Sequence, residues 1–253
     1  MNSSVNADEV WSAALDSSVG AALAIARGGR VVVRRNLPAA ERERDLDLAA
    51  WCLDACREAG VPLAAIRCWT VGIGPGSFSG LRAGIAFVQG VTAATGAQVR
   101  GVPSSLALAC MAAAAGTAAA PGCRVGVLHD ARRQQLILSV WELTDAGWRE
   151  TVPAGVREPA ELPAALAGCD RLVTPHAATV APRLDPSALG RLLAVADLDA
   201  AALLAPPGWP WPAAAPAESA DGPAIEPIYV RPPVFVPPRP PGPPADWLTT
   251  PLE

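Results

Sequence analysis

The glycine-rich run from Gly74 to Arg82 has the residue types that could do the most specific chemistry in this chain. A strand-like segment, Cys68 to Val71, leads into it, and Ser77 or Ser79 can cap a helix that continues to Ala94. Backbone amides at such a helix start can bind a phosphate or another anion. The same glycines also serve tight packing of strand against helix, which is the interpretation we favour over a small-ligand site.

Lysine chemistry is excluded by composition. All 20 basic residues of the chain are arginine, so no Walker loop, Schiff base or lysine base is available. The two histidines, His129 and His176, lie far apart and form no HxxxH or HExxH motif. His129 beside Asp130 suggests a general base, but a single histidine at a strand end is more often structural.

The cysteines do not predict a metal site. Cys52 and Cys56 lie one helical turn apart and could in principle share a metal, yet no histidine is near them in sequence. We expect them to be buried as small apolar residues. The sequence therefore predicts no catalytic residue, no metal and no cofactor.

The helix after the glycine run is apolar on two faces. One row consists of Leu81, Ile85, Val88 and Thr92, and the other consists of Gly80, Gly84, Phe87, Val91 and Ala94. One face must cover the chain's own sheet, so the other requires another helix or another protein. The spacing of Gly80 and Gly84 predicts close approach of a neighbouring helix, with Arg82 and Gln89 at its edge.

The elements that must position these residues follow from pattern and turn signals. Strands are expected within 10–26 and 31–34 around a Gly28-Gly29 hairpin, and again at 98–102. An amphipathic helix is predicted over 41–59, ended by Gly60, with Leu46, Ala49, Leu53 and Cys56 along one stripe. A serine after Pro103 is expected to cap an apolar helix that is too short to cross a bilayer and is therefore buried.

The second half repeats the plan of the first. Strands are predicted at 125–128 and 136–143, with a turn after Asp130 and a hairpin at 145–147. Asp16 stands at the same place in the first half, after a strand and before a turn and a hairpin. The sequence thus predicts an internal structural duplication.

Composition limits the function classes. A net charge of −4 and a pI near 5.3 argue against a protein that holds nucleic acid on its own basic surface. No secretory signal is evident, and six scattered cysteines without a CxxC pair fit a reduced, cytoplasmic protein. The tail after residue 232 is rich in proline and is expected to be polyproline-like.

Four motifs together resemble the TsaB (YeaZ) family. They are GPGSFSGLRAG from Gly74, ALDSS from Ala14, HDARR from His129 and PIYVRP from Pro227, and they occur in the order of that family. The resemblance implies an α/β fold of two tandem ribonuclease-H-like lobes, as in the actin/Hsp70/sugar-kinase superfamily. The lobes are expected over residues 8–104 and 105–232, followed by the tail, 233–253.

The resemblance also implies a function without catalysis. TsaB proteins are subunits of bacterial tRNA threonylcarbamoyladenosine synthesis, which modifies the adenosine beside the anticodon. The expected partners are a TsaD-type transferase, with which the chain forms a heterodimer, and a TsaE-type ATPase. In the absence of partners the chain is expected to form a homodimer. It is expected to contact tRNA only indirectly and to contact no membrane. The expected partner interface consists of Leu46, Ala49, Leu53, Ser77, Phe78, Gly80, Arg82, Gly84, Phe87 and Val91.

Two other functions stay open from sequence. In the superfamily, the position of Asp16 holds a metal-binding or phosphate-facing carboxylate, and Asp130 has the same ambiguity. A degenerate nucleotide-dependent enzyme, of the sugar-kinase or carbamoyl-transferring kind, would use both; otherwise each aspartate caps its own turn. A third possibility is a homodimer with a separate regulatory role. The family's usual His-Ser pair is absent, because Glu41-Arg42-Glu43-Arg44 occupies that region, so no role of that histidine is carried over.

Overall fold

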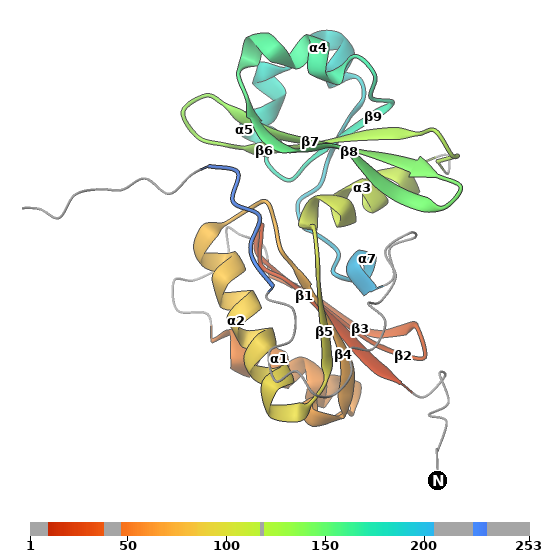
Figure 1. Ribbon diagram of the computed structural model, residues 1–253, viewed down its shortest axis with the longest axis vertical. Coiled ribbons are helices and arrows are strands. Elements are labelled where there is room, and N and C mark those ends of the chain that lie inside the picture. The colour runs from red at the N-terminus through yellow and green to blue at the C-terminus, as the bar shows by residue number, and fades with distance from the viewer. Residues whose placement is uncertain (1–9, 38–46, 117–118, 205–224, 232–253) are drawn as a thin grey trace, which may run out of the picture.

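Two five-stranded sheets form the framework of the protein, and helical segments lie between them (Figure 1). The computed structural model describes residues 10–37, 47–116, 119–204 and 225–231. The predicted helical residues 41–46, including Leu46, and the predicted tail from 233 onward lie outside the described residues.

The first sheet has the strand order β3-β2-β1-β4-β5. Its strands are β1 (Trp11–Asp16), β2 (Ala21–Arg27), β3 (Arg30–Leu37), β4 (Ile66–Gly72) and β5 (Gln98–Val102). β1, β2 and β3 form an antiparallel meander, whereas β4 and β5 run parallel to β1. The parallel strands need crossover connections, and helices α1 (Leu48–Ala59) and α2 (Phe78–Thr95) supply them.

The second sheet repeats this arrangement with the order β10-β9-β6-β7-β8. Its strands are β6 (Arg124–Asp130), β7 (Leu136–Thr144), β8 (Gly147–Arg157), β9 (Arg171–Thr174) and β10 (Leu192–Ala194). Three antiparallel strands are again followed by two parallel ones. The predicted duplication, and with it the fold of two ribonuclease-H-like lobes, is confirmed.

The two lobes differ in their helices. α1 and α2 have 12 and 18 residues, whereas α4 (Leu162–Leu166), α5 (Ala177–Val180) and α6 (Pro186–Leu189) in the second lobe have five, four and four. α1 begins at Leu48 after the N-cap Asp47, whose carboxylate accepts a hydrogen bond from Ala50 N. It ends at the left-handed Gly60, and only this end was predicted from the sequence.

Helix α3 (Ser104–Ala114) lies between the sheets and is buried along most of its length, as predicted from its apolar sequence (Figure 1). The core cluster around it contains Ala14 and Ala24 from the first sheet and Val125 and Val127 from the second. The opposite face of the first sheet presents Leu15 to α1 and α2. Because both faces are covered, residues 21–26 of the inner strand β2 are all apolar and buried.

The predicted serine cap of α3 is wrong in detail. Pro103 occupies the N-cap position and Ser104 lies inside the first turn. The Ser104 hydroxyl instead accepts a hydrogen bond from Gly74 N at 3.0 Å and donates one to Asp16. This serine therefore ties the start of α3 to the end of β1 and to the glycine-rich run.

The end of the described chain returns to the first lobe. Helix α7 (Ala201–Leu204) packs on β1, β2 and β4, and Ile228 N donates to Ile73 O at 2.8 Å. The expected assignment of residues 105–232 to the second lobe therefore needs correction for these two segments. Among the described helices, none has the length and hydrophobicity that crossing a bilayer requires.

Candidate functional site

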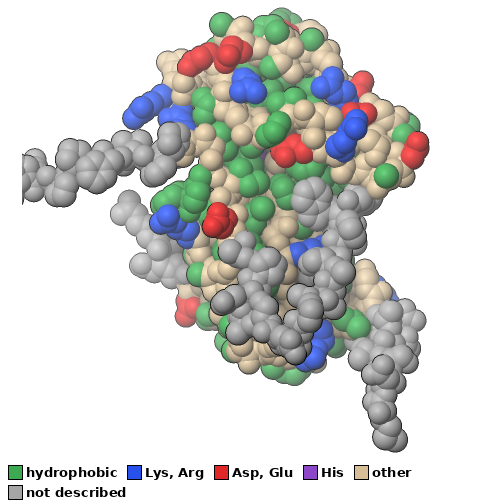
Figure 2. Space-filling model, in the orientation of Figure 1, with side chains coloured by type: hydrophobic (Ala, Val, Ile, Leu, Met, Phe, Trp, Pro, Cys, Tyr) green, Lys and Arg blue, Asp and Glu red, His purple; other side chains and the backbone are tan. Residues whose placement is uncertain are grey.

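A cleft of about 1170 Å³ lies between the lobes. Its first-lobe wall comes from the turn after β1 and from the glycine-rich run into α2, and its second-lobe wall comes from the ends of β6 and β9. The segment 228–231 closes one side. Figure 2 shows hydrophobic side chains gathered where the two lobes meet on this face. The predicted glycine turn, Asp130 and both histidines therefore lie around one space.

Asp16 is held by its own turn. Its Oδ1 accepts hydrogen bonds from Ser18 N at 2.8 Å and Ser18 Oγ at 2.5 Å, and its Oδ2 accepts one from Ser104 Oγ at 2.5 Å. The side chain is 2 % exposed. Burial raises the pKa of Asp16, and the hydrogen bonds from the two serines oppose that rise. Of the two interpretations that the sequence left open, the structure shows the turn cap.

Asp130 repeats the device in the second lobe. Its Oδ1 accepts a hydrogen bond from Arg132 N at 2.9 Å and lies 3.6 Å from the Arg183 guanidinium. Arg132, Arg133 and Gln134 all have positive φ, which is uncommon for residues with side chains. The carboxylate caps this strained turn, just as Asp16 caps the turn after β1.

The glycine-rich run packs against the Ser17-Ser18 turn. Ser77 N donates to Ser18 O at 2.7 Å, and a Cβ added at Gly76 would lie 2.5 Å from the same oxygen. Ser77 caps α2 by accepting from Gly80 N, as predicted. The interpretation that these glycines allow close packing is confirmed.

The expected role of Gly80 and Gly84 at a partner helix is wrong. Both are buried on the inner face of α2, where Ser17 Oγ donates to Gly80 O at 2.8 Å. A Cβ added at Gly84 would lie 2.3 Å from Ser17 Oγ. The close neighbour is therefore a turn of the same chain.

The other expected interface residues divide between surface and core. Ala49, Leu53, Ser77, Phe78 and Arg82 are exposed, and Leu53 and Phe78 are 40 % and 56 % accessible. Phe87 and Val91 are half-buried against the first-lobe core. The sequence analysis missed three exposed small residues on the outer face of α2, Ala83, Ala86 and Gly90.

Arg82 belongs to an aromatic cluster at the mouth of the cleft. Its guanidinium carbon lies 4.0 Å from the centre of the Phe78 ring, and its Nε donates to Tyr229 Oη at 2.9 Å. The Phe78 and Tyr229 ring centres are 5.5 Å apart. Tyr229 was not predicted here, although the PIYVRP motif was recognised.

The two histidines lie side by side at the second-lobe wall. Their ring centres are 5.7 Å apart, and His176 Nδ1 accepts a hydrogen bond from Asp130 N at 3.4 Å. His129 is 1 % exposed, and neither of its ring nitrogens has a hydrogen-bond partner. Burial, and then the neighbouring His176, lowers the pKa of His129 from 6.5 to about 3, so the ring is neutral near pH 7.

The cysteine pair is buried, as predicted. Cys52 and Cys56 lie on the inner face of α1, and burial raises the pKa of Cys52 to about 12, with a smaller contribution from Cys56. Within the described residues, no group of three or more histidine, cysteine, aspartate or glutamate side chains is placed to hold a metal.

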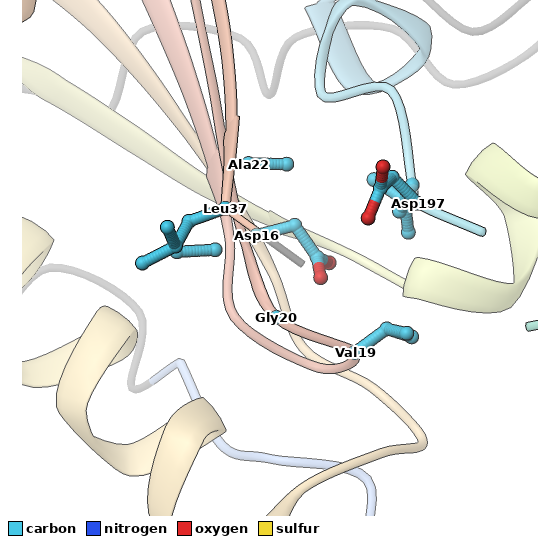
Figure 3. A pocket seen from close by; sticks show the side chains of 8 residues that line it. Asp16, Val19, Gly20, Ala22, Leu37 and Asp197 are labelled. Carbon is cyan, nitrogen blue, oxygen red and sulfur yellow. The ribbon is translucent and has the colours of Figure 1, made fainter. Parts of the chain in front are cut away.

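A second, much smaller hollow lies behind Asp16. Asp16, Gly20, Leu37 and Asp197 are among the residues that line it (Figure 3). Its volume of about 10 Å³ is at the lower limit for one water molecule. It is too small for a cofactor.

Comparison with known proteins agrees with this geometry. The family model described as "TsaD: tRNA N6-adenosine threonylcarbamoyltransferase" matches residues 38–190. A solved structure of an uncharacterized Pseudomonas aeruginosa protein, described as similar to peptidase YeaZ, is 25% identical with a TM-score of 0.66, covering 88% of this chain and 100% of that one. P. aeruginosa YeaZ is 27% identical with a TM-score of 0.61, covering 77% and 89%. No curated protein matches the sequence.

Proposed function

This chain belongs to the TsaD family and, within it, to the TsaB (YeaZ) branch, and we propose on that premise that it is a non-catalytic activating subunit. Its partner would be a TsaD-type transferase that attaches a threonylcarbamoyl group to the adenosine beside the tRNA anticodon. A TsaE-type ATPase would join the assembly. With a pI near 5.3, this subunit would touch tRNA only indirectly.

The observation that carries the proposal is the state of the two aspartates. A phosphate-transferring enzyme of this fold needs carboxylates free to face a metal and phosphates. Here Asp16 accepts three hydrogen bonds from Ser18 and Ser104, and Asp130 is held by its own turn and by Arg183. Gly76 and Ser77 are packed on Ser18. The nucleotide-dependent alternative would have to break these contacts.

The surface that fits the partner is the outer face of α1 and α2. The two helices lie on the same side of the first sheet (Figure 1). Leu53 on α1 and Phe78 on α2 are exposed apolar side chains, and Ala83, Ala86 and Gly90 leave α2 without bulk. Small residues let a partner helix approach closely. We expect the same face to pair with a second copy when the transferase is absent.

Reconstitution tests this function. The protein is combined with a TsaD-type transferase and a TsaE-type ATPase from the same genome, together with tRNA, ATP and an activated threonylcarbamoyl donor. The modified nucleoside in tRNA is then measured by mass spectrometry. Product is expected only when this chain and the transferase are both present. Product formation or ATP turnover by this chain alone would support the enzymatic alternative instead.

A matched pair of substitutions tests the surface. Ala86→Arg places a long charged side chain on the outer face of α2, and we expect it to weaken binding to the transferase about 100-fold or more. Ala164→Arg makes the same change on an exposed position of α4 and should bind normally. Equal binding by both variants, measured by calorimetry, would move the interface away from α2.

A further inference from the structure

The imidazole of His129 is buried, and neither of its ring nitrogens has a hydrogen-bond partner. Side chains alternate along β6, and Val125 and Val127 pack on the interlobe helix α3. His129, two residues further, therefore points from the same face of the sheet toward the cleft that it lines. A buried polar group without a hydrogen bond costs about 1–3 kcal/mol, so such groups in folded proteins normally have a partner. A bound molecule would supply the missing partner.

The second observation is the charge around the same cleft. Among the described residues that line it, three are arginines, Arg82, Arg132 and Arg231. The one carboxylate among these residues, Asp130, already faces Arg183. His129 and His176 lie beyond this rim at the second-lobe wall. Arginine guanidinium groups bind carboxylates and phosphates through charge-assisted hydrogen bonds.

We propose that the interlobe cleft binds a small organic anion, whose carboxylate or phosphate lies against the arginine rim and whose body reaches His129. A neutral imidazole carries one donor and one acceptor, so the part that meets His129 should be a polar uncharged group such as a hydroxyl or an amide. The cleft volume of about 1170 Å³ slightly exceeds that of a typical small-molecule pocket. The site is independent of the α1–α2 surface proposed for the transferase.

This ligand differs from a metal–nucleotide complex. In the described part of the chain no metal-binding cluster is present, and the two aspartates are bonded to their own turns. Recognition would come from arginine and imidazole groups, without a metal bridge. Binding should therefore not require magnesium.

The histidines provide the readout. The chain has only two, and both line the cleft, so a proton–carbon NMR spectrum of the imidazoles reports on this site alone. The full-length protein is titrated with inorganic phosphate, with glycerol 3-phosphate and with malate, at constant ionic strength and without magnesium. Comparing phosphate with malate distinguishes a preference for phosphate from one for carboxylate. Glycerol 3-phosphate carries hydroxyl groups beside its phosphate and tests whether they improve binding.

Arg132→Gln and Arg133→Gln form the matched pair for this titration. Both residues are exposed, adjacent and at positive φ, but only Arg132 lines the cleft. We expect saturable shifts of both imidazole signals with at least one hydroxylated anion, about tenfold weaker binding for Arg132→Gln, and unchanged binding for Arg133→Gln. Absence of shifts with all three probes at 10 mM, about the weakest affinity of interest, would overturn the proposal. Equal weakening by both variants would also overturn it.

Discussion

The two lobes share one backbone plan but use their aspartate turns differently. In each, a strand ends in an aspartate whose carboxylate accepts a hydrogen bond from the amide two residues on. Asp16 is also bonded to Ser104 of the interlobe helix and is almost fully buried. Asp130 is only partly buried and is paired with Arg183 at 3.6 Å.

This difference separates two tasks. The first-lobe turn is tied to the glycine-rich run and to the start of the interlobe helix, because Ser104 bonds both to Asp16 and to Gly74. The second-lobe turn carries one cleft arginine, Arg132, and follows His129, which has no hydrogen-bond partner. The first lobe also carries the long helices. We therefore associate the first lobe with assembly and the second with ligand binding.

The largest effect is expected from Gly84→Leu. The new side chain would collide with Ser17, since even a Cβ would lie 2.3 Å from its hydroxyl oxygen. Overpacking of this kind costs typically about 1–3 kcal/mol and sometimes more, and the collision with a bonded turn puts this variant at the upper end. Chemical denaturation should show a loss of about 3 kcal/mol or more. A variant as stable as the parent would mean that α2 can move away from the turn.

Asp16→Ala and Asp130→Ala test how much each aspartate turn contributes to stability. The first change leaves the buried hydroxyls of Ser18 and Ser104 without their acceptor, so we expect a loss of about 2–3 kcal/mol. The second change removes a turn cap that is only partly buried and an ion pair at 3.6 Å, so the free energy of unfolding should fall by about 1 kcal/mol. Urea unfolding of both variants measures the difference. Equal losses would break the distinction between the two turns.

Acid should destabilise the protein through His129. Its pKa is about 3 in the folded protein and near 6.5 when unfolded, so between these values the unfolded chain binds the proton more strongly. Stability is then complete above pH 6.5 and falls as the pH falls. The loss at pH 5 relative to pH 8 is about 2 kcal/mol from this group.

His129→Leu isolates that contribution. The leucine does not titrate, and it replaces a buried imidazole that makes no hydrogen bond, so the free energy of unfolding at pH 8 should rise by about 1–3 kcal/mol. Between pH 5 and 8 the free energy of unfolding, measured by denaturant titration, should then vary by about 2 kcal/mol less than in the parent. An unchanged pH dependence would show that His129 is not the group that titrates.

Local signals predicted the strands and turns well. Gly60 ends α1, Ser77 caps α2, and the strand predicted over 98–102 is β5. Each of these depends on residues close together in sequence. The repeated strand, aspartate and hairpin order was likewise sufficient to predict the second lobe.

Contacts between segments that are distant in sequence could not be predicted. Helical period showed that α2 has two apolar faces, but not that Gly84 meets Ser17 in the turn after β1. The histidine pair had a usable signal, because His129 lies near the end of β6 and His176 follows β9, its parallel neighbour. Carboxyl ends of parallel strands share an edge of the sheet. Placing the two histidines together from sequence would have required knowing that β6 pairs with β9.

The smallest predicted effect concerns the outer face of the first lobe. Gly90 lies on α2 with no atom within 4 Å of an added Cβ, whereas Gly84 on the same helix has Ser17 at 2.3 Å. Gly90→Ala should therefore stabilise the protein by about 0.8–1.0 kcal/mol, because alanine favours the helix and meets no neighbour. Gly84→Ala should destabilise it, since the same preference is outweighed by the clash. Thermal unfolding of the two variants gives the sign directly. If both variants gained stability, the Ser17 contact would not constrain α2, and the inner and outer faces of the helix would not differ as described.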